Sequence, residues 1–394
     1  MNKKPVVSVA GKQGPFQNVV DALDRLDLTF LKDKSILIKP NVGRAAFPER
    51  GYNTHPLAIA GAIEVFQKNG ASKIVIGESP LVGIDTMEAF KKGGITEVAD
   101  RYNVELIDLD SRPFIKKEIP NARVVPITKV CGAIYEFDIL VSLPVAKVHM
   151  HTGVTLGIKN LKGCLYKHEK VRYHQLEYQY HEFPEKTLDS AISDLATILL
   201  PDITIVDGFI GMEGLGPSGG EAIKSDFAVA STHPFGADII ACILMDVDPE
   251  EVPHLNLVSK RNKLPINKTD YMVYPENYQD YIVPYKKPPQ NISVKFENIE
   301  VYENEACSSC LSTLMLFLRR FKDDMLSYVL NDGKFHIAIG KGVKHAKEGT
   351  VFVGNCTCKN KDKGIYIKGC PPVPTRIYEA ITGVEPEENE PEVE

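Results

Sequence analysis

The chain contains, at residues 35–41, the sequence SILIKPN. Its apolar run suits a short strand buried on both faces of a sheet, as parallel strands usually are. Lys39 and Asn41 follow at the point where the strand ends. Open α/β sheets bind ligands beyond the carboxyl ends of their strands, so these two polar residues are expected to face a ligand.

Similar short runs recur before residue 245, each bounded by glycine, proline or aspartate. They predict strands at Val6–Ala10, Ser35–Lys39, Lys73–Gly77, Glu105–Asp108, Phe137–Leu143 and Ile203–Asp207. Helical patterns lie between them, at Phe16–Leu26, from Thr54 onward and at Leu188–Leu200. Strands that alternate with helices predict an α/β fold with a largely parallel sheet covered by helices.

Four segments follow from the changes in composition along the chain. They are an α/β domain at 1–248, an irregular segment rich in proline and tyrosine at 249–300, a small cysteine-rich α+β unit at 301–383 and an acidic disordered tail at 384–394. A strand is expected at Ile292–Phe296. The cysteine-rich unit should contain helices at Leu311–Leu330 and Thr375–Thr382, with strands at His336–Ile339 and Val351–Val353.

Composition narrows the classes of function. The 394 residues carry a net charge of −6, and the last ten residues alone hold six glutamates. The remaining body is neutral, which gives no electrostatic reason to expect nucleic acid as a partner. No apolar run is long enough to span a membrane and no secretory signal is visible, so we expect a cytoplasmic protein without a membrane partner.

Five of the eight cysteines crowd between residues 307 and 370. Cys307 and Cys310 form a C-x-x-C pair just before a helix, where backbone N–H groups stabilise thiolates. Cys356 follows a strand and a glycine, and Cys370 lies in the sequence Gly-Cys-Pro-Pro. These four cysteines are the expected metal ligands, and Cys358 is left out of the set.

Four thiolates suit a [4Fe–4S] cluster or structural zinc. Zinc ribbons usually pair two similar knuckles, whereas a proline directly after a ligand cysteine is typical of cluster-binding loops. The cluster is therefore preferred, with zinc as the alternative. Unliganded buried cysteines and a thioredoxin-like role for Cys307 and Cys310 remain open alternatives.

Polar residues also follow several other predicted strands of the α/β domain. If the sheet is parallel, they gather at one cationic edge suited to a carboxylate or phosphate. The expected substrate-binding residues are Lys39, Asn41 and Asn160, and the expected catalytic residues are Glu78, Lys147, His149 and Lys159. His149 and His151 either bind metal or are polar loop residues, and the sequence does not decide between these.

Three common nucleotide and hydrolase motifs lack support. Residues 214–219 match G-x-G-x-x-G, but they are separated from the preceding strand, contain Pro217 and precede another predicted strand at Asp226–Ala230. We interpret them as a glycine-rich loop. The chain contains neither a P-loop signature nor G-x-S-x-G.

From about Ile36 to Asp248 the sequence resembles the DUF362 family, a domain of unknown function often found in iron–sulfur proteins. The resemblance rests on Lys39-Pro40-Asn41, Thr54-His55-Pro56, Gly77-Glu78, Lys147-Val148-His149, Gly157-Ile158-Lys159-Asn160 with Gly163, Asp207-Gly208, Gly214-Leu215-Gly216-Pro217 and Asp238. The four predicted cysteine ligands look like the cluster-binding extension of some members. The resemblance implies a cytoplasmic iron–sulfur protein but no reaction, and a distant likeness to nickel-dependent lactate racemase implies a catalytic cleft lined by histidine and lysine.

Three hypotheses follow. The first is an iron–sulfur redox protein whose α/β domain binds an anionic small molecule or an electron-transfer protein. The second is a non-redox enzyme with a lysine and histidine cleft and a structural cluster. The third is a binding or metal-delivery protein, structured by zinc or holding a transferable metal. A homo-oligomer is compatible with all three.

Overall fold

The structure is a computed structural model, and it describes residues 4–176, 186–217, 219–288 and 296–386. The chain divides into two compact units. The first comprises Met1–Tyr173 and Tyr180–Pro288, and the second comprises His174–Gln179 and Pro289–Glu394. The predicted tail beyond residue 386 and most of the predicted strand Ile292–Phe296 lie outside the described residues.

The first unit is built on a ten-stranded mixed sheet with the main strand order β12-β1-β11-β10-β7-β2-β3-β4. Its strands are β1 (Val6–Gly11), β2 (Ser35–Pro40), β3 (Lys73–Glu78), β4 (Glu105–Asp108), β7 (Ile139–Leu143), β8 (Val145–His149), β9 (Gly153–Thr155), β10 (Ile203–Glu213), β11 (Glu221–Ser231) and β12 (Met272–Tyr274). Neighbours from β10 through β7, β2 and β3 to β4 are parallel. The expected largely parallel α/β fold is therefore confirmed.

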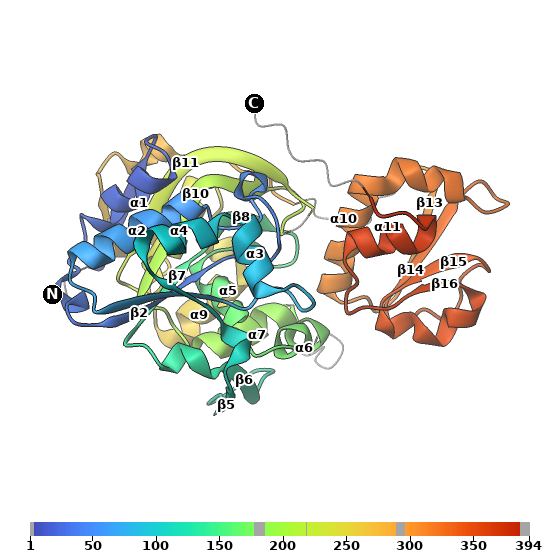
Figure 1. Ribbon diagram of the computed structural model, residues 1–394, viewed down its shortest axis with the longest axis horizontal. Coiled ribbons are helices and arrows are strands. Elements are labelled where there is room, and N and C mark those ends of the chain that lie inside the picture. Colours follow the sequence, from blue (N-terminus) through green and yellow to red (C-terminus); the bar gives the residue numbers. More distant parts are fainter. Residues whose placement is uncertain (1–3, 177–185, 218, 289–295, 387–394) are drawn as a thin grey trace. The chain divides into compact units, whose positions relative to one another are not determined.

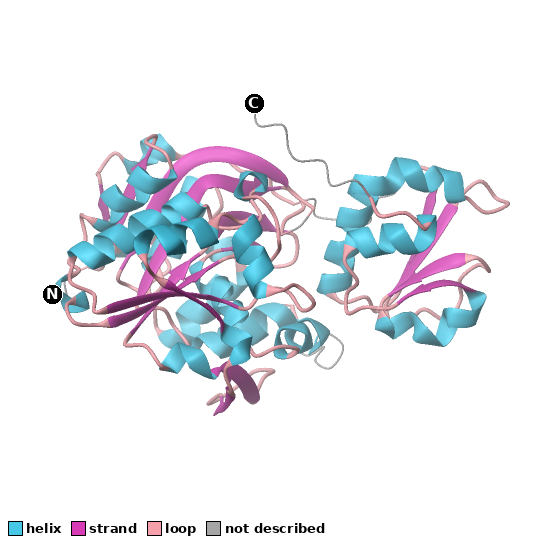
Figure 2. Ribbon diagram, in the orientation of Figure 1, coloured by secondary structure: helices cyan, strands magenta, loops and turns pink. Residues whose placement is uncertain are grey.

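Helices cover both faces of this sheet (Figures 1 and 2). They are α1 (Pro15–Leu23), α2 (Pro56–Lys68), α3 (Thr86–Lys92), α4 (Ile95–Tyr102), α5 (Gly157–Asn160), α6 (Glu169–Gln175), α7 (Thr187–Ala196), α8 (Gly236–Leu244) and α9 (Pro253–Asn262). Helices α1, α2 and α4 pack on one face, with α5, α7, α8 and α9 on the other. The apolar run Ile36–Ile38 of β2 is buried between the two layers, as a central parallel strand requires.

The glycine-rich segment after Glu213 links two antiparallel strands. β10 pairs with β11 over Thr204–Glu213, and Gly214 adopts a left-handed φ of 70° at the turn. No helix begins among the described residues of this segment, which leads into β11 rather than into the helix that a dinucleotide site needs. The interpretation of residues 214–219 as a loop is consistent with this arrangement.

Three parts of the first unit differ from the sequence expectations. Residues 145–149 form the strand β8, which pairs with β10 and β9. A separate hairpin, β5 (Phe114–Glu118) with β6 (Ile127–Cys131), was not predicted. The expected connecting segment contains α9 and β12, and the structure groups its residues up to Pro288 with the α/β unit. The long-range pairing of β12 with β1 has no signal in local sequence.

The second unit contains a four-stranded parallel sheet in the order β13-β14-β15-β16. Its elements are β13 (Ile299–Glu303), α10 (Ser308–Met325), β14 (Phe335–Ile339), β15 (Thr350–Val353), the 3₁₀ segment η11 (Asn355–Lys363), β16 (Gly364–Ile367) and α11 (Pro374–Thr382). Leu314, Phe317 and Leu318 of α10 pack on this sheet in a separate apolar core. The predicted helix Leu311–Leu330 is thus shifted to begin at Ser308, directly after Cys307.

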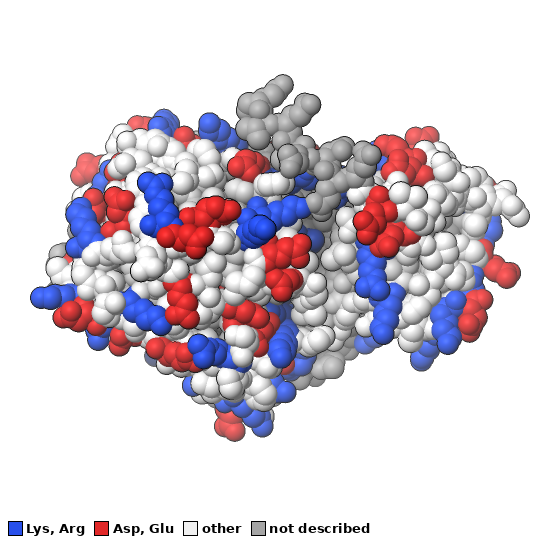
Figure 3. All heavy atoms as spheres, viewed as in Figure 1, with Lys and Arg blue, Asp and Glu red and all other residues white. Residues whose placement is uncertain are grey.

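Two surface features bear on possible partners. Within the described ranges, no helix combines the length and apolar character needed to cross a membrane. Figure 3 shows acidic and basic side chains interspersed over the face of the α/β unit that is in view.

Asp194 of α7 should be a strong stability determinant. Its buried carboxylate accepts 2.8 Å hydrogen bonds from the backbone N–H groups of Arg123, Val124 and Val125, and it pairs with Arg261. Asp194→Ala would leave these backbone donors without an acceptor and Arg261 without its counter-charge, so we expect a loss of about 3–5 kcal/mol in unfolding free energy, measured by urea denaturation.

The matched control is Asp24→Ala, which removes an exposed ion pair with Lys68 and should cost no more than about 0.5 kcal/mol. Equal effects of the two substitutions would contradict the assignment.

Candidate functional site

A buried ion pair lies at the carboxyl ends of β2 and β3. Lys39 and Glu78 are 1% and 2% exposed, and Nζ of Lys39 is 2.8 Å from Oε1 of Glu78. Nζ also donates to the carbonyl of Pro40 and to Oδ1 of Asn160, each at 2.9 Å. The ammonium has three hydrogens to donate, and three groups accept them: the Glu78 carboxylate, the Pro40 carbonyl and the Asn160 side chain. Its hydrogen-bonding capacity is therefore used within the protein.

The carboxylate of Glu78 is equally well satisfied. Its Oε2 accepts from the backbone N–H of Val42 and its Oε1 from that of Ser79, both at 2.8 Å. The backbone of Gly163 also packs tightly here, since a Cβ at this position would lie 2.5 Å from Nζ of Lys39. The pair therefore fixes the shape of the strand ends, and its two residues act as positioning groups in this structure.

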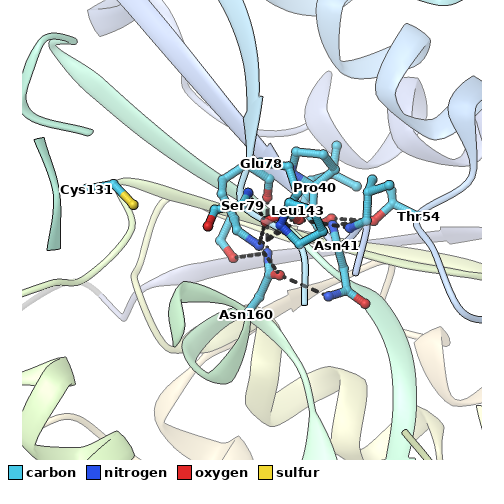
Figure 4. A network of polar contacts seen from close by, with 12 residues as sticks. Pro40, Asn41, Thr54, Glu78, Ser79, Cys131, Leu143 and Asn160 are labelled. Atoms are coloured by element: carbon cyan, nitrogen blue, oxygen red, sulfur yellow. Dashed lines mark hydrogen bonds and ion pairs between the residues drawn. The ribbon is translucent and has the colours of Figure 1, made fainter. Parts of the chain in front are cut away.

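Two asparagines, Asn41 and Asn160, extend the network (Figure 4). Asn160 accepts from Lys39 and donates to the Lys39 carbonyl and to Oγ of Ser142, both at 3.1 Å. Asn41 donates its backbone N–H to Oγ1 of Thr54, whose hydroxyl donates to the Leu143 carbonyl at 2.7 Å. The ends of β2, β3 and β7 and the start of α2 are thereby joined.

Lys147 is a second buried lysine at this edge. It is 4% exposed on β8, and its Nζ donates to Oδ1 of Asn41 at 2.7 Å and to the carbonyl of Tyr52. Neither acceptor carries a charge. Burial lowers the pKa of Lys147 well below its usual value, and the positive charges of Lys159 and Arg44 lower it further. Lys147 therefore loses its proton more readily than an exposed lysine does.

Lys159 of α5 is half-buried and donates to Oγ1 of Thr155 at 3.3 Å. Burial lowers its pKa to about 8, while the negative charge of Asp189 opposes the shift. Neither oxygen of the buried Asp189 carboxylate has a hydrogen-bond donor among the described residues, although Oδ1 lies 3.6 Å from Nδ1 of His254. At pH 7 Lys159 is therefore mostly charged.

His149 lies at the end of β8 and is 2% exposed. Its Nδ1 accepts from the backbone N–H groups of His151 and Thr152, at 3.1 and 3.3 Å. A neutral ring in this position carries its proton on Nε2. The rings of His149 and His151 stand edge to face with centroids 5.7 Å apart.

Two carboxylates contribute to this edge that the sequence analysis did not assign. Asp207 of β10 accepts from the backbone N–H of His55 at 2.8 Å, and Asp238 of α8 accepts from those of Gly157 and Ile158. Burial raises their pKa values to about 6 and about 7. Both carboxylates hold backbone segments in place. The only indication of them in the sequence was that Asp207 and Asp238 are among the residues that resemble the family.

The four predicted cysteine ligands of the second unit interact electrostatically. Cys307 and Cys310 are buried at the start of α10, and a hydrogen bond from Cys310 lowers the pKa of the Cys307 thiol to about 6, with help from backbone N–H groups. The hydrogen bond to Cys307 and burial raise the pKa of the Cys310 thiol, and negative charges on Cys307, Cys356 and Cys370 raise it further. The four predicted ligands thus form one electrostatically interacting group.

Asn355 joins the two remaining cysteine loops. Its backbone N–H donates to the Gly369 carbonyl at 2.8 Å, and its Oδ1 accepts from the Gly369 N–H at 3.0 Å. A Cβ at Gly354 would meet Sγ of Cys310 at 3.6 Å, so this loop passes directly beside the C-x-x-C pair. The sequence analysis missed Asn355, whose only signal is its place beside Cys356.

The cysteine group does not surround a single point. Over the described ranges, no set of three or more histidine, cysteine, aspartate or glutamate side chains is arranged to hold a metal ion. Sulfur ligands of one tetrahedral zinc ion must lie about 3.8 Å apart, whereas a cluster holds its thiolates farther from one another. The ligand predictions for Cys307, Cys310, Cys356 and Cys370 therefore remain predictions.

A comparison with protein families matches residues 36–243 to the model described as "Domain of unknown function (DUF362)". The chain therefore belongs to the DUF362 family. The matched domain holds the Lys39–Glu78 pair and both Lys147 and Lys159. It does not include the cysteine group, so the family membership says nothing about a cluster.

Relatives of this DUF362 protein are distant. The thylakoid-associated protein sll1697 of Synechocystis sp. is 24% identical over 246 residues, covering 59% of this chain and 69% of the relative. The apoprotein of lactate racemase from Thermoanaerobacterium thermosaccharolyticum has 16% identity and a TM-score of 0.40, covering 62% of this chain and 58% of its own. A Thermotoga maritima protein has 12% identity and a TM-score of 0.37, with coverages of 58% and 57%.

The Lys39–Glu78 pair gives a direct test of the network. Glu78→Gln should lower the unfolding free energy by about 3–5 kcal/mol, because it leaves the Lys39 ammonium buried without a counter-charge.

The double variant Lys39→Met/Glu78→Gln should cost less than the sum of its single substitutions in urea denaturation. Additive costs would show that the two groups are not coupled and would contradict this account.

Proposed function

We propose that the protein is an iron–sulfur redox protein whose DUF362 domain binds an anionic small molecule. One observation carries the part about the anion. Lys147 lies on β8 beside Asn41, Lys159 lies on α5, and neither has an ion-pair partner within 4.0 Å in the described part of the chain. The positive charge of Lys159 favours a carboxylate or phosphate ligand.

The two lysines differ in a way that suits proton chemistry. Lys159 is mostly charged at pH 7 and would bind the anion. Lys147, whose pKa is lowered, would accept a proton from the ligand, while Nε2–H of His149 would donate a hydrogen bond to it. Two groups whose surroundings give them different pKa values can act as an acid and a base at the same pH. The assignment of Glu78 to catalysis remains a prediction, although its hydrogen bonds favour a positioning role.

The sulfur group of the second unit supports the redox part of the proposal. Cys307, Cys310, Cys356 and Cys370 would hold a [4Fe–4S] cluster, which supplies one-electron transfer when bound. The donor set is wholly sulfur, and Asn355 with α10 holds the loops that carry it. An electron-transfer protein is then the expected partner. A cytoplasmic location belongs to this proposal too, although the relative in Synechocystis is described as thylakoid-associated.

A non-redox enzyme with a structural cluster is the second candidate. It is favoured by the observation that Lys147, Lys159 and His149 all lie within the DUF362 domain. Their acid and base roles need no electron. Replacement of a cysteine ligand distinguishes the two candidates. The redox protein should lose turnover while anion binding persists, whereas the non-redox enzyme should keep both.

Metal content tests the cluster. Protein purified without oxygen should contain near-stoichiometric four iron and four sulfide per chain, with a broad visible absorption band. Cys356→Ser should lose most of the iron and the colour. Cys358→Ser is the matched control, since Cys358 is an exposed cysteine two residues away, and it should retain both.

One zinc per chain without colour would overturn the redox proposal. Equal loss of iron in both variants would overturn the choice of Cys356.

Anion binding tests the lysines. Calorimetric titration with inorganic phosphate and with malonate should show binding that weakens as pH rises through about 8, because Lys159 loses its charge there. Lys159→Met should weaken binding at least tenfold at pH 7, whereas the exposed control Lys91→Met should not change it.

Binding that is independent of pH between 7 and 9, or unaffected by Lys159→Met, would contradict the assignment.

A further inference from the structure

The hairpin β5–β6 forms a small sheet of its own, separate from the ten-stranded sheet. Figure 1 shows it at the edge of the α/β unit, apart from β2 and β7. Its residues have no part in the proposed anion site or in the cysteine group. One face of the hairpin carries an unusual set of exposed side chains.

The pairing register defines that face. Phe114 pairs with Cys131, Lys116 with Lys129, and Glu118 with Ile127. Paired residues point to the same side of a sheet, as do residues two apart. Phe114 and Ile127 are 43% and 40% exposed, and they stand at opposite ends of the face with the two lysines between them.

The two exposed lysines lie directly opposite each other. Like charges in this position destabilise an antiparallel pair, so the arrangement favours an anion above the face. The only carboxylate on this face is Glu118. Nζ of Lys129 also lies 4.8 Å from the ring centroid of Phe114, which places charge and apolar surface side by side.

The apolar and cationic surface continues beyond the hairpin. The ring of Tyr166 lies 5.2 Å from that of Phe114, and Nζ of the exposed Lys167 lies 4.9 Å from the Tyr166 ring centroid. The opposite side of the hairpin is anchored to the unit, because Thr128 is buried and bonds to Glu169 and to Tyr173. The hairpin is thus held firmly with its mixed face outward.

We propose that this face, formed by Phe114, Lys116, Ile127, Lys129, Tyr166 and Lys167, binds the surface of a membrane rich in anionic lipids. Lysines attract anionic headgroups, and aromatic and aliphatic side chains beside them enter the headgroup layer. Such a contact needs no long apolar segment. The proposal therefore differs from the sequence-based expectation of no membrane partner, which rested on the lack of a membrane-spanning run. The inference is independent of the proposed function.

Vesicle sedimentation of the full chain tests the inference. The protein should sediment with vesicles of phosphatidylcholine and phosphatidylglycerol in equal parts, but not with phosphatidylcholine alone, and high salt should release it. Lys116→Gln/Lys129→Gln should lower the partition coefficient about 30-fold, as expected for two lysines near an anionic surface. Phe114→Ser/Ile127→Ser should lower it about tenfold or more.

The control variants carry the same changes elsewhere on exposed residues, as Lys32→Gln/Lys91→Gln and Phe30→Ser, and they should bind as the unmodified protein does. Thermal unfolding of every variant distinguishes lost binding from lost fold. Failure of the folded protein to bind the anionic vesicles, or equal loss in the control variants, overturns the proposal. Retention on RNA but not on vesicles overturns it in favour of a polyanion.

Discussion

The buried ion pair between Lys39 and Glu78 is the interaction on which the rest of the DUF362 domain's polar edge depends. Taking two charges out of water is costly unless both are fully hydrogen-bonded, and here several of the partners come from distant parts of the chain. The pair is bonded to Asn160 on α5 and to Val42 in the loop after β2, and Glu78 itself lies at the end of β3. Asn41 then stands where it can accept from Lys147. The pair is therefore best understood as the framework that positions the lysines of the proposed anion site.

Hydrogen-bond partners also distinguish the residues that shape the site from those that are available for chemistry. Lys39 and Glu78 satisfy one another, whereas the acceptors of Lys147 are a side-chain amide and a backbone carbonyl. Burial depresses the pKa of Lys147, and the positive charges of Lys159, Arg44 and Lys39 depress it further, while the charge of Glu78 opposes the shift. Three lysines that look alike in sequence thus have different roles. The cysteine unit depends on a separate constraint, the paired hydrogen bonds between Asn355 and Gly369.

Much of the fold was predictable because its strands are local apolar runs and its helices begin with clear signals. The run Ile36–Ile38 and the Pro56 that starts α2 are examples. The antiparallel pairing of β1 with β11 and the addition of β12 were not predictable, since they join residues more than 200 positions apart. For the site, the sequence indicated which polar residues gather. It could not indicate that Glu78 would neutralise Lys39, because that depends on the spacing of β2 and β3 in three dimensions.

The most direct test of the central claim is a crystal structure of protein purified without oxygen, with anomalous diffraction recorded at the iron and zinc absorption edges. The account predicts one strong iron peak surrounded by the sulfur atoms of Cys307, Cys310, Cys356 and Cys370. A zinc peak there, or four cysteines with no metal in protein shown to be fully loaded before crystallisation, would contradict it.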